Sequence, residues 1–187
     1  TAIGALTKAA GLHPCGVDRE ARTEDPVFAE VYATHQLLAV LPEMDYVVIA
    51  APLTAETRGM AGPEFFKAMQ PTARFINIGR GPITQTQALV EALEAGEIAG
   101  AALDVFEEEP LPPEHPLWTM PHVVVSAHMA GDVAGWREAL SEQFIDNYHN
   151  WKAAKPLFNR VDKELGYVPK PYPRGKASAL SRAIPNH

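Results

Sequence analysis

Four polar features of this sequence each follow an apolar run of the kind that forms a buried strand, and their chemistry is complementary. They are the aspartate Asp18, the arginine Arg80 between two glycines, the acidic run Glu107–Glu109 and the histidine His128. An arginine flanked by glycines can approach a carboxylate closely and bind it through two parallel hydrogen bonds. One carboxylate of the acidic run could orient the histidine and favour its protonated form, which suits proton transfer. Taken singly, each feature is also typical of an ordinary turn or a solvated loop.

The spacing between Gly4 and Asp18 fits the glycine-rich fingerprint of a dinucleotide-binding site. That fingerprint places an acid about 20 residues after its first glycine, where the acid accepts hydrogen bonds from ribose hydroxyls. If Gly4 is the third glycine, the second position falls on Thr1 and the first lies before it. The acid predicts NAD as the cofactor, and NADP is possible because Arg19 can pair with a 2′-phosphate. A surface acid at a turn is the alternative interpretation of Asp18.

The elements that would position these residues alternate between strands and helices. We expect strands over His13–Asp18, Asp45–Ala51, Arg74–Ile78, Ile98–Val105 and His122–Ser126, and helices over Ala5–Ala10, His35–Leu41, Gly62–Met69, Thr84–Ala95 and Val133–Lys152. Uninterrupted apolar strands indicate a parallel sheet that is covered by helices on both faces. The alternation predicts an α/β doubly wound fold. Ligands of such sheets bind outside the carboxyl ends of the strands, where the four polar features fall.

The amino-acid composition argues against several classes of binding partner and indicates the cellular compartment. The 187 residues include 16 Lys+Arg and 23 Asp+Glu, a net charge of −7, which argues against a nucleic-acid binder or a polybasic membrane-surface protein. No stretch approaches the roughly 20 apolar residues that span a bilayer. Cys15 is the single cysteine, which excludes an internal disulfide framework and a cysteine-rich zinc module. The seven histidines show no ligand spacing, so we expect no metal site, and we expect a reducing, cytoplasmic compartment.

Several stretches occur together in one order, and in that order the chain resembles the D-isomer-specific 2-hydroxyacid dehydrogenase family from about Thr1 to Pro169. These stretches are Asp45–Gly59, Asn77–Gly81, Gly100–Leu111, Pro116–Trp118 and His128–Gly131, and the ending Pro156–Asp162 with Gly166 and Tyr167 is similar to the family's close. The resemblance implies a Rossmann-type NAD(P)-binding domain over 1–132 and a helix and segment over 133–168 that return toward a substrate domain. It also implies that the first strand and that substrate domain lie outside this sequence, so the chain alone is expected to lack full activity. The proline-rich, basic stretch 169–187 is expected to form a separate tail.

The resemblance also implies a role for individual residues. Arg80 would hold the substrate carboxylate, His128 would exchange a proton with the keto oxygen, and Glu109 would support the charged imidazole. The implied cofactor-binding residues are Ile3, Gly4, Asp18, Arg19, Ala51, Pro52, Thr57, Ile78, Gly79, Arg80, Asp104, His128 and Gly131. Among them, Asp104 would lie near the nicotinamide carboxamide. The family usually has proline before its catalytic histidine, and Ala127 in its place predicts a looser turn.

The function that follows is hydride transfer between NAD(H) and a small 2-oxo or D-2-hydroxy acid. The resemblance implies a homodimer, and the sequence does not select the acid. Two alternatives stay open at this stage. One is an NAD(H)-sensing binding protein that resembles dehydrogenase-like corepressors, and the other is a truncated pseudoenzyme.

Overall fold

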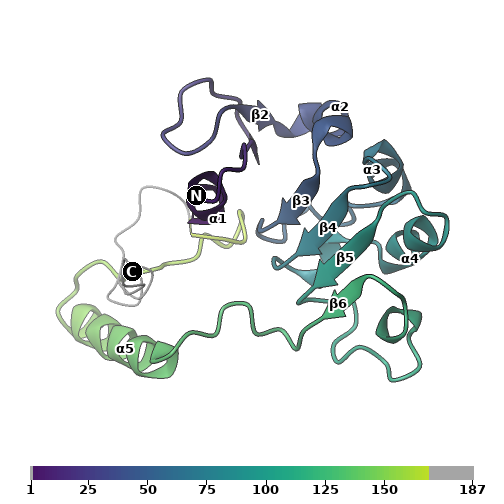
Figure 1. Ribbon diagram of the computed structural model, residues 1–187. Coiled ribbons are helices and arrows are strands. Elements are labelled where there is room, and N and C mark those ends of the chain that lie inside the picture. Colours follow the sequence, from purple (N-terminus) through teal and green to yellow (C-terminus); the bar gives the residue numbers. More distant parts are fainter. Residues whose placement is uncertain (1, 169–187) are drawn as a thin grey trace.

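A four-stranded parallel sheet forms the centre of the protein in the computed structural model, which describes residues 2–168 (Figure 1). Its strands, in spatial order, are β3 (Tyr46–Ile49), β4 (Arg74–Asn77), β5 (Gly100–Leu103) and β6 (Val123–Val125). All three pairings are parallel, so the carboxyl ends of the four strands lie at one edge. The predicted strands are confirmed, each within a few residues. The predicted tail at 169–187 lies outside the described residues, and the domain boundaries at 132 and 168 stay predictions.

A second, two-stranded parallel sheet lies beside the first in the described part of the chain. It pairs β1 (Gly16–Asp18) with β2 (Val31–Ala33). The sequence does not single out β2, because it is three residues long and follows a charged loop rather than an apolar run. Asp18 is the last residue of β1, as predicted.

Two helices cover one face of the four-stranded sheet, and this contact is the centre of the hydrophobic core. They are α3 (Pro63–Ala68) and α4 (Thr86–Glu94), which lie on the same side in Figure 1. Phe65 and Phe66 of α3 meet Phe75 of β4 edge to face, with ring centroids 5.8 and 5.1 Å apart. Edge-to-face pairs of this kind add to the stabilisation from burial alone.

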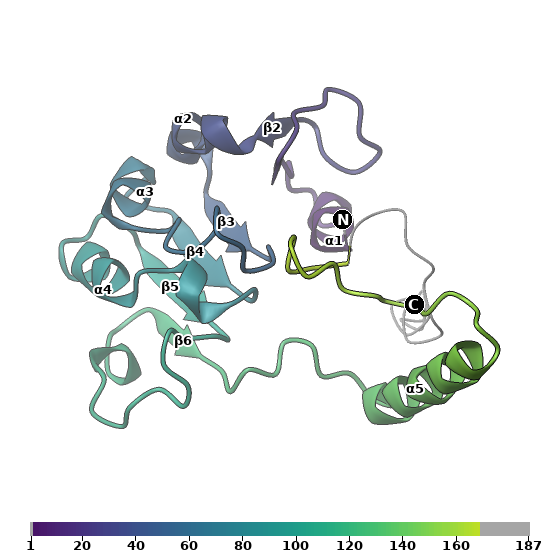
Figure 2. The same ribbon diagram turned by 180° about the vertical axis from the view of Figure 1, so that it is seen from behind.

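Within residues 2–168, helices cover only one face of the four-stranded sheet, so the expected cover on both faces is not seen there. On the face away from α3 and α4, Val48 of β3 is 37% exposed and Val124 of β6 is 64% exposed. In Figures 1 and 2, α1 (Ala2–Ala9) and α5 (Trp136–Lys152) stand apart from this face instead of packing on it. A continuous apolar run therefore predicts the strands here but not their burial.

The remaining helices differ from the predicted ranges for local reasons. The helix expected over His35–Leu41 is a single turn, α2 (Leu37–Val40), between the 3-10 turns Thr34–Gln36 and Leu41–Glu43. Pro42 explains its end, because proline cannot donate the backbone hydrogen bond that would continue it. Helix α5 follows its predicted apolar spacing, but that stripe faces solvent. The stripe consists of Leu140, Phe144, Tyr148 and Trp151, each about half to three-quarters exposed. No helix in residues 2–168 is both long and apolar enough to cross a bilayer.

Candidate active site

His128 and Glu109 form a hydrogen-bonded pair beyond the carboxyl ends of β6 and β5. Nδ1 of His128 lies 2.8 Å from Oε2 of Glu109. The other oxygen of Glu109 accepts a hydrogen bond from the Phe106 amide at 2.9 Å, which fixes the carboxylate. With Nδ1 engaged in this way, Nε2 is the ring nitrogen that can exchange a proton with a ligand. The acidic run predicted a carboxylate partner for the histidine and the resemblance implied Glu109, and the structure pairs Glu109 with His128.

The electrostatics of this pair favour an ionised carboxylate. Burial raises the pKa of Glu109, but the His128 hydrogen bond, the Phe106 amide and the charges of His128 and Arg80 lower it, so the net pKa lies below its ordinary value. An anionic Glu109 is the form that supports a protonated imidazole. The charge of Arg80 is the smallest of these effects on the pKa of Glu109.

Asp104 holds the turn that carries His128. Its buried carboxylate accepts the Ser126 hydroxyl at 2.6 Å and the amides of Met129 and Ala130 at 2.8 Å each. His128 itself adopts φ 54°, the left-handed region, which histidine tolerates better than most residues. Three hydrogen bonds to one carboxylate hold this turn, and the looser turn predicted from Ala127 stays a prediction.

These hydrogen bonds also keep Asp104 ionised. Burial raises the pKa of its carboxyl, but the hydrogen bonds from Ser126, Ala130 and Met129 and the charge of His128 outweigh it, so the net pKa is lowered. The resemblance implies that Asp104 lies near the nicotinamide. The structure adds a positioning role for Asp104 that the sequence analysis missed, and only its place after an apolar run hinted at it.

The loop that presents Arg80 is fitted closely to its neighbours. A Cβ added at Gly81 would lie 1.7 Å from the carbonyl oxygen of Phe106, so only glycine lets these two backbones meet. Beneath the loop, the fully buried Asn77 donates to the Arg80 carbonyl at 3.2 Å and accepts from the Gly79 amide at 2.9 Å. Nη1 of Arg80 donates to the Gly79 carbonyl at 2.7 Å, and its side chain is exposed. Asn77 is a second positioning residue that the sequence analysis passed over.

Some of the predicted cofactor residues follow β3 and others follow β4, and the backbones of the two segments lie close together. A Cβ on Gly79 would lie 2.9 Å from the Ala51 carbonyl oxygen, so the ends of the two strands approach closely. The Thr57 hydroxyl donates to the Pro52 carbonyl at 2.8 Å and thereby closes the loop after β3. Ile78 is partly exposed at this edge.

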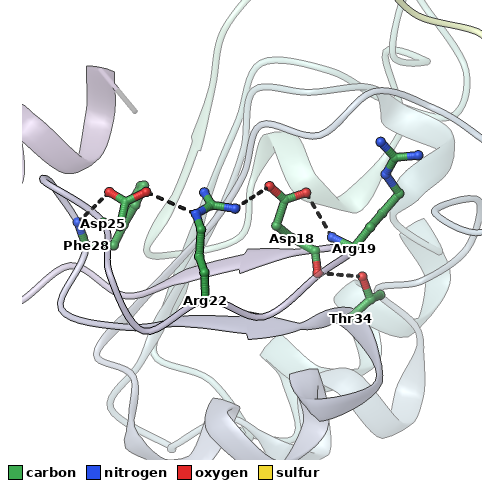
Figure 3. Close-up of polar contacts among 6 residues, drawn as sticks. All are labelled: Asp18, Arg19, Arg22, Asp25, Phe28 and Thr34. Atoms are coloured by element: carbon green, nitrogen blue, oxygen red, sulfur yellow. Dashed lines mark hydrogen bonds and ion pairs between the residues drawn. The ribbon is translucent and has the colours of Figure 1, made fainter. Parts of the chain in front are cut away.

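A separate group of predicted cofactor residues lies at α1 and β1. Gly4 is buried in the first turn of α1, where a Cβ would lie 2.5 Å from the Phe28 ring, and its neighbour Ile3 is partly exposed. Asp18 accepts the Arg19 amide at 2.8 Å and pairs with Arg22 at 3.0 Å (Figure 3).

The last described turn of the chain, which contains Tyr167, lies next to Arg19. The Arg19 guanidinium lies 5.4 Å from the centre of the Tyr167 ring. Neither Arg22 nor Tyr167 was predicted as a site residue; the sequence analysis names Tyr167 only as part of the family-like ending. The remaining predicted residue, Gly131, lies in the exposed turn after His128, and a Cβ there would meet nothing within 4 Å. Across residues 2–168, the structure contains no group of three or more His, Cys, Asp or Glu that could hold a metal ion.

Comparison with known proteins identifies the family. Residues 1–130 match the model of the D-isomer-specific 2-hydroxyacid dehydrogenase NAD-binding domain. The chain is 40% identical over 153 residues to a glyoxylate reductase of Thermococcus gammatolerans, covering 82% of this chain and 45% of that protein. It is 44% identical over 115 residues to a glyoxylate/hydroxypyruvate reductase B of an Enterobacter species, covering 62% of this chain and 36% of that protein.

Solved structures agree with the sequence comparison. An NADPH-dependent glyoxylate/hydroxypyruvate reductase of Sinorhizobium meliloti, in complex with NADP and sulfate, matches with a TM-score of 0.77 and 35% identity. The match covers 87% of this chain and 52% of that one. The chain belongs to the D-isomer-specific 2-hydroxyacid dehydrogenase family, and the predicted Rossmann-type α/β fold is confirmed. It spans about half the length of the relatives that it matches.

Proposed function

We propose that this chain acts in hydride transfer between a nicotinamide dinucleotide and a small 2-oxo acid or D-2-hydroxy acid. The observation that carries the proposal is the Glu109–His128 pair at 2.8 Å, set on a turn that Asp104 fixes and within the electrostatic reach of Arg80. This set combines a proton donor, its anionic support and a cation that can bind a carboxylate. The names of the relatives, glyoxylate reductase and glyoxylate/hydroxypyruvate reductase, support a 2-oxo acid of two or three carbons.

The residues present fit a dinucleotide at the carboxyl edge of the sheets. Gly4 in the first turn of α1 packs closely on Phe28 and Gly79 after β4 packs closely on the Ala51 backbone, so neither position has room for a side chain, and Asp18 ends β1 with an exposed carboxylate. When bound there, the nicotinamide supplies the hydride. Related structures that hold NADPH or NADP support NADP(H), and the match to an NAD-binding domain supports NAD(H), so either dinucleotide is proposed.

The geometry supports the following proposed roles for the protein side chains. Arg80 binds the carboxylate of the 2-oxo acid and draws electron density from the neighbouring keto group. As the keto carbon accepts the hydride, Nε2 of His128 gives its proton to the keto oxygen, which becomes the hydroxyl. Glu109 stabilises the imidazolium before that transfer, and solvent restores the proton afterwards. In the reverse direction, neutral His128 removes the hydroxyl proton.

Two further properties belong to the proposal. The exposed apolar stripe on α5 supports a homodimer, because apolar patches of this kind commonly mark protein interfaces. The single cysteine supports a reducing, cytoplasmic location.

The test is steady-state oxidation of NADH and NADPH by the 187-residue chain with glyoxylate, hydroxypyruvate and pyruvate. We expect His128→Gln to lower kcat by about 100-fold or more, because a positioned general acid contributes roughly 10²–10⁴-fold. Arg80→Ala should raise KM for the acid as well. His122→Ala is the matched control, since His122 precedes the same strand, β6, at its opposite end, and it should leave the rate unchanged. A slow rate of turnover is enough for this test, because the test compares kcat of each variant with kcat of the unmodified chain. Equal turnover by the His128→Gln variant would contradict the proposal, as would failure of the unmodified chain to bind either NADH or NADPH.

A further inference from the structure

The side chain of Glu107 binds the first residue of helix α4. Its Oε2 accepts the backbone amide of Thr86 at 2.5 Å, although the two residues are 21 positions apart in sequence. The residue before the helix, Gln85, makes no side-chain cap, and its amide group instead donates to the Gly59 carbonyl at 2.9 Å. The first turn of α4 contains no acidic residue of its own. Glu107 therefore supplies, from another loop, the negative group that the amino end of a helix favours.

The start of α4 forms one unit with the loop that carries Arg80. A single 3-10 turn lies between them, and the Ile83 amide closes it by donating to the Arg80 carbonyl at 3.2 Å. Thr84 follows this turn and is buried, and its hydroxyl accepts a hydrogen bond from Asn77 at 2.9 Å. The same Asn77 side chain donates to the Arg80 carbonyl at 3.2 Å. Through these hydrogen bonds, a contact at Thr86 also restrains the position of Arg80.

Glu107 itself belongs to the loop 106–109, which supports the proton-transfer side of the site. In this loop the Phe106 amide donates to Glu109 at 2.9 Å, and Glu109 pairs with His128 at 2.8 Å. The Phe106 carbonyl lies against Gly81, where an added Cβ would be 1.7 Å from its oxygen. That contact limits how closely the two loops approach, but packing of this kind does not hold them together. The hydrogen bond from Glu107, the next residue, joins them.

We propose that Glu107 is a positioning residue, which ties the loop 106–109 to the start of α4 and so fixes Arg80 relative to His128. The inference rests on the proposed function for the roles of Arg80 and His128. It adds to that function a residue that acts through other residues rather than on the substrate. A 2-oxo acid that one group binds and another protonates needs both groups in register, because a small misplacement of reacting groups lowers the rate steeply.

The first experiment measures hydrogen exchange of single backbone amides in the 187-residue chain and its Glu107→Ala variant. We expect the Thr86 amide to exchange about fivefold faster in the variant, the loss typical of a helix cap. Because Glu107 joins the two loops, exchange of the Phe106 amide should accelerate as well. A residue that only capped α4 would leave Phe106 unchanged. Both rates are compared with those of the β4 amides, which report global unfolding.

Two further variants separate the hydrogen bond from the charge. Glu107→Gln keeps an oxygen that can accept the Thr86 amide, so it should restore most of the slow exchange at both amides. Glu108→Ala is the matched control, because it removes the same charge from the neighbouring exposed position of the same loop. It should leave both amides unchanged. Equal acceleration by Glu108→Ala and Glu107→Ala would overturn the inference, because the effect would then belong to the charge of the loop.

The second experiment measures kcat and KM for glyoxylate with NADH. We expect Glu107→Ala to lower kcat by about tenfold, with Glu107→Gln closer to the unmodified chain and Glu108→Ala unchanged. A residue that only stabilised α4 would leave kcat of the folded protein constant. If the unmodified chain turns over too slowly for this measurement, exchange at Phe106 decides the inference by itself.

The outcomes distinguish this inference from the proposed function. Unchanged exchange at Phe106 or unchanged kcat in a folded Glu107→Ala variant overturns the inference and leaves the proposed function intact. Equal turnover by His128→Gln overturns the proposed function, whereas faster exchange at Phe106 in Glu107→Ala would still support the link between the two loops.

Discussion

The carboxylate of Asp104 accepts the amide of Met129 at 2.8 Å, and so an acid at the end of β5 fixes the residue next to the histidine after β6. The Ser126 hydroxyl and the Ala130 amide bind the same carboxylate. His128 lies at the centre of this turn and adopts a positive φ of 54°. A conformation of this kind persists only when its surroundings impose it, and Asp104 is the group that does so.

Replacing Asp104 by asparagine should destabilise the protein and loosen the His128 turn. The variant keeps the shape of the side chain, but its amide nitrogen would face a backbone donor. We expect the free energy of unfolding to fall by about 2–3 kcal/mol, the cost of leaving buried partners of a charged acceptor unsatisfied. Urea denaturation measures this loss, and amide exchange at residues 126–131 should accelerate. Asp132→Asn is the control, because Asp132 is exposed and lies only just beyond the turn; equal effects of the two variants would rule out a special role for Asp104.

Gly81→Ala should be more damaging than an ordinary glycine substitution. The new methyl group would lie 1.7 Å from the Phe106 carbonyl oxygen, so the Arg80 loop and the Phe106–Glu109 loop must separate. We expect a loss of about 3 kcal/mol, at the upper end of overpacking costs. Gly131→Ala is the matched control, because nothing lies within 4 Å of its added Cβ, and its stability should change by less than about 0.5 kcal/mol. Thermal unfolding of the two variants side by side makes the comparison, and similar midpoints would contradict it.

The stability of the protein should fall in acid, and Asp104 should account for part of the slope. The pKa values of Asp104 and Glu109 are lowered in the folded state, so the unfolded chain binds more protons at mildly acidic pH. Their contribution is present above the ordinary carboxyl pKa of about 4 and is lost as pH falls through the lowered folded-state values. Urea midpoints measured from about pH 6 down to about pH 3 should therefore decline. The Asp104→Asn variant should show a shallower decline, and an identical slope would argue against an ionised Asp104.

Helix α5 should make the protein bind apolar probes. Phe144 is 75% exposed and Trp151 is 68% exposed, on the same side of the helix as Leu140 and Tyr148. We expect Phe144→Ser to reduce the fluorescence of a bound apolar dye while leaving the far-ultraviolet circular dichroism unchanged. Ser141→Ala, a substitution at an exposed position of the same helix, provides the control. A signal that does not depend on Phe144 would place the dye elsewhere.

The sequence predicts those features that depend on short, continuous patterns. Apolar runs place the four strands of the main sheet and the polar residues that follow them, and the order of motifs identifies the family. By contrast, β2 is missed because Val31–Ala33 is too short to show a pattern. The predicted burial of both sheet faces is not seen within residues 2–168, and an apolar run does not itself show whether a helix packs over it.

Positioning residues are harder to predict than the groups that they position. Asp104 reaches the backbone of a turn more than twenty residues away, and Glu107 reaches the first residue of α4 from a separate loop. Such contacts depend on register and on turns that bring distant segments together. Asn77 and Gly81 stand inside a recognised motif, yet only the packing of Phe106 against the loop explains why glycine is required there.

The division into two sheets has a consequence for the unfolding of the protein. The main hydrophobic cluster runs from Leu41 to Leu117 and includes residues of β3, β4 and β5, whereas Val31 and Ala33 of β2 are buried outside it. Segments that share little core with the rest of a protein can open without global unfolding. The β1–β2 pair should therefore form a cooperative unit of its own, with amides that exchange faster than those of β4. Because Asp18 belongs to that unit and His128 follows β6, the acid proposed to contact the dinucleotide and the histidine proposed to transfer the proton are expected to lie on parts of the protein with different local stabilities.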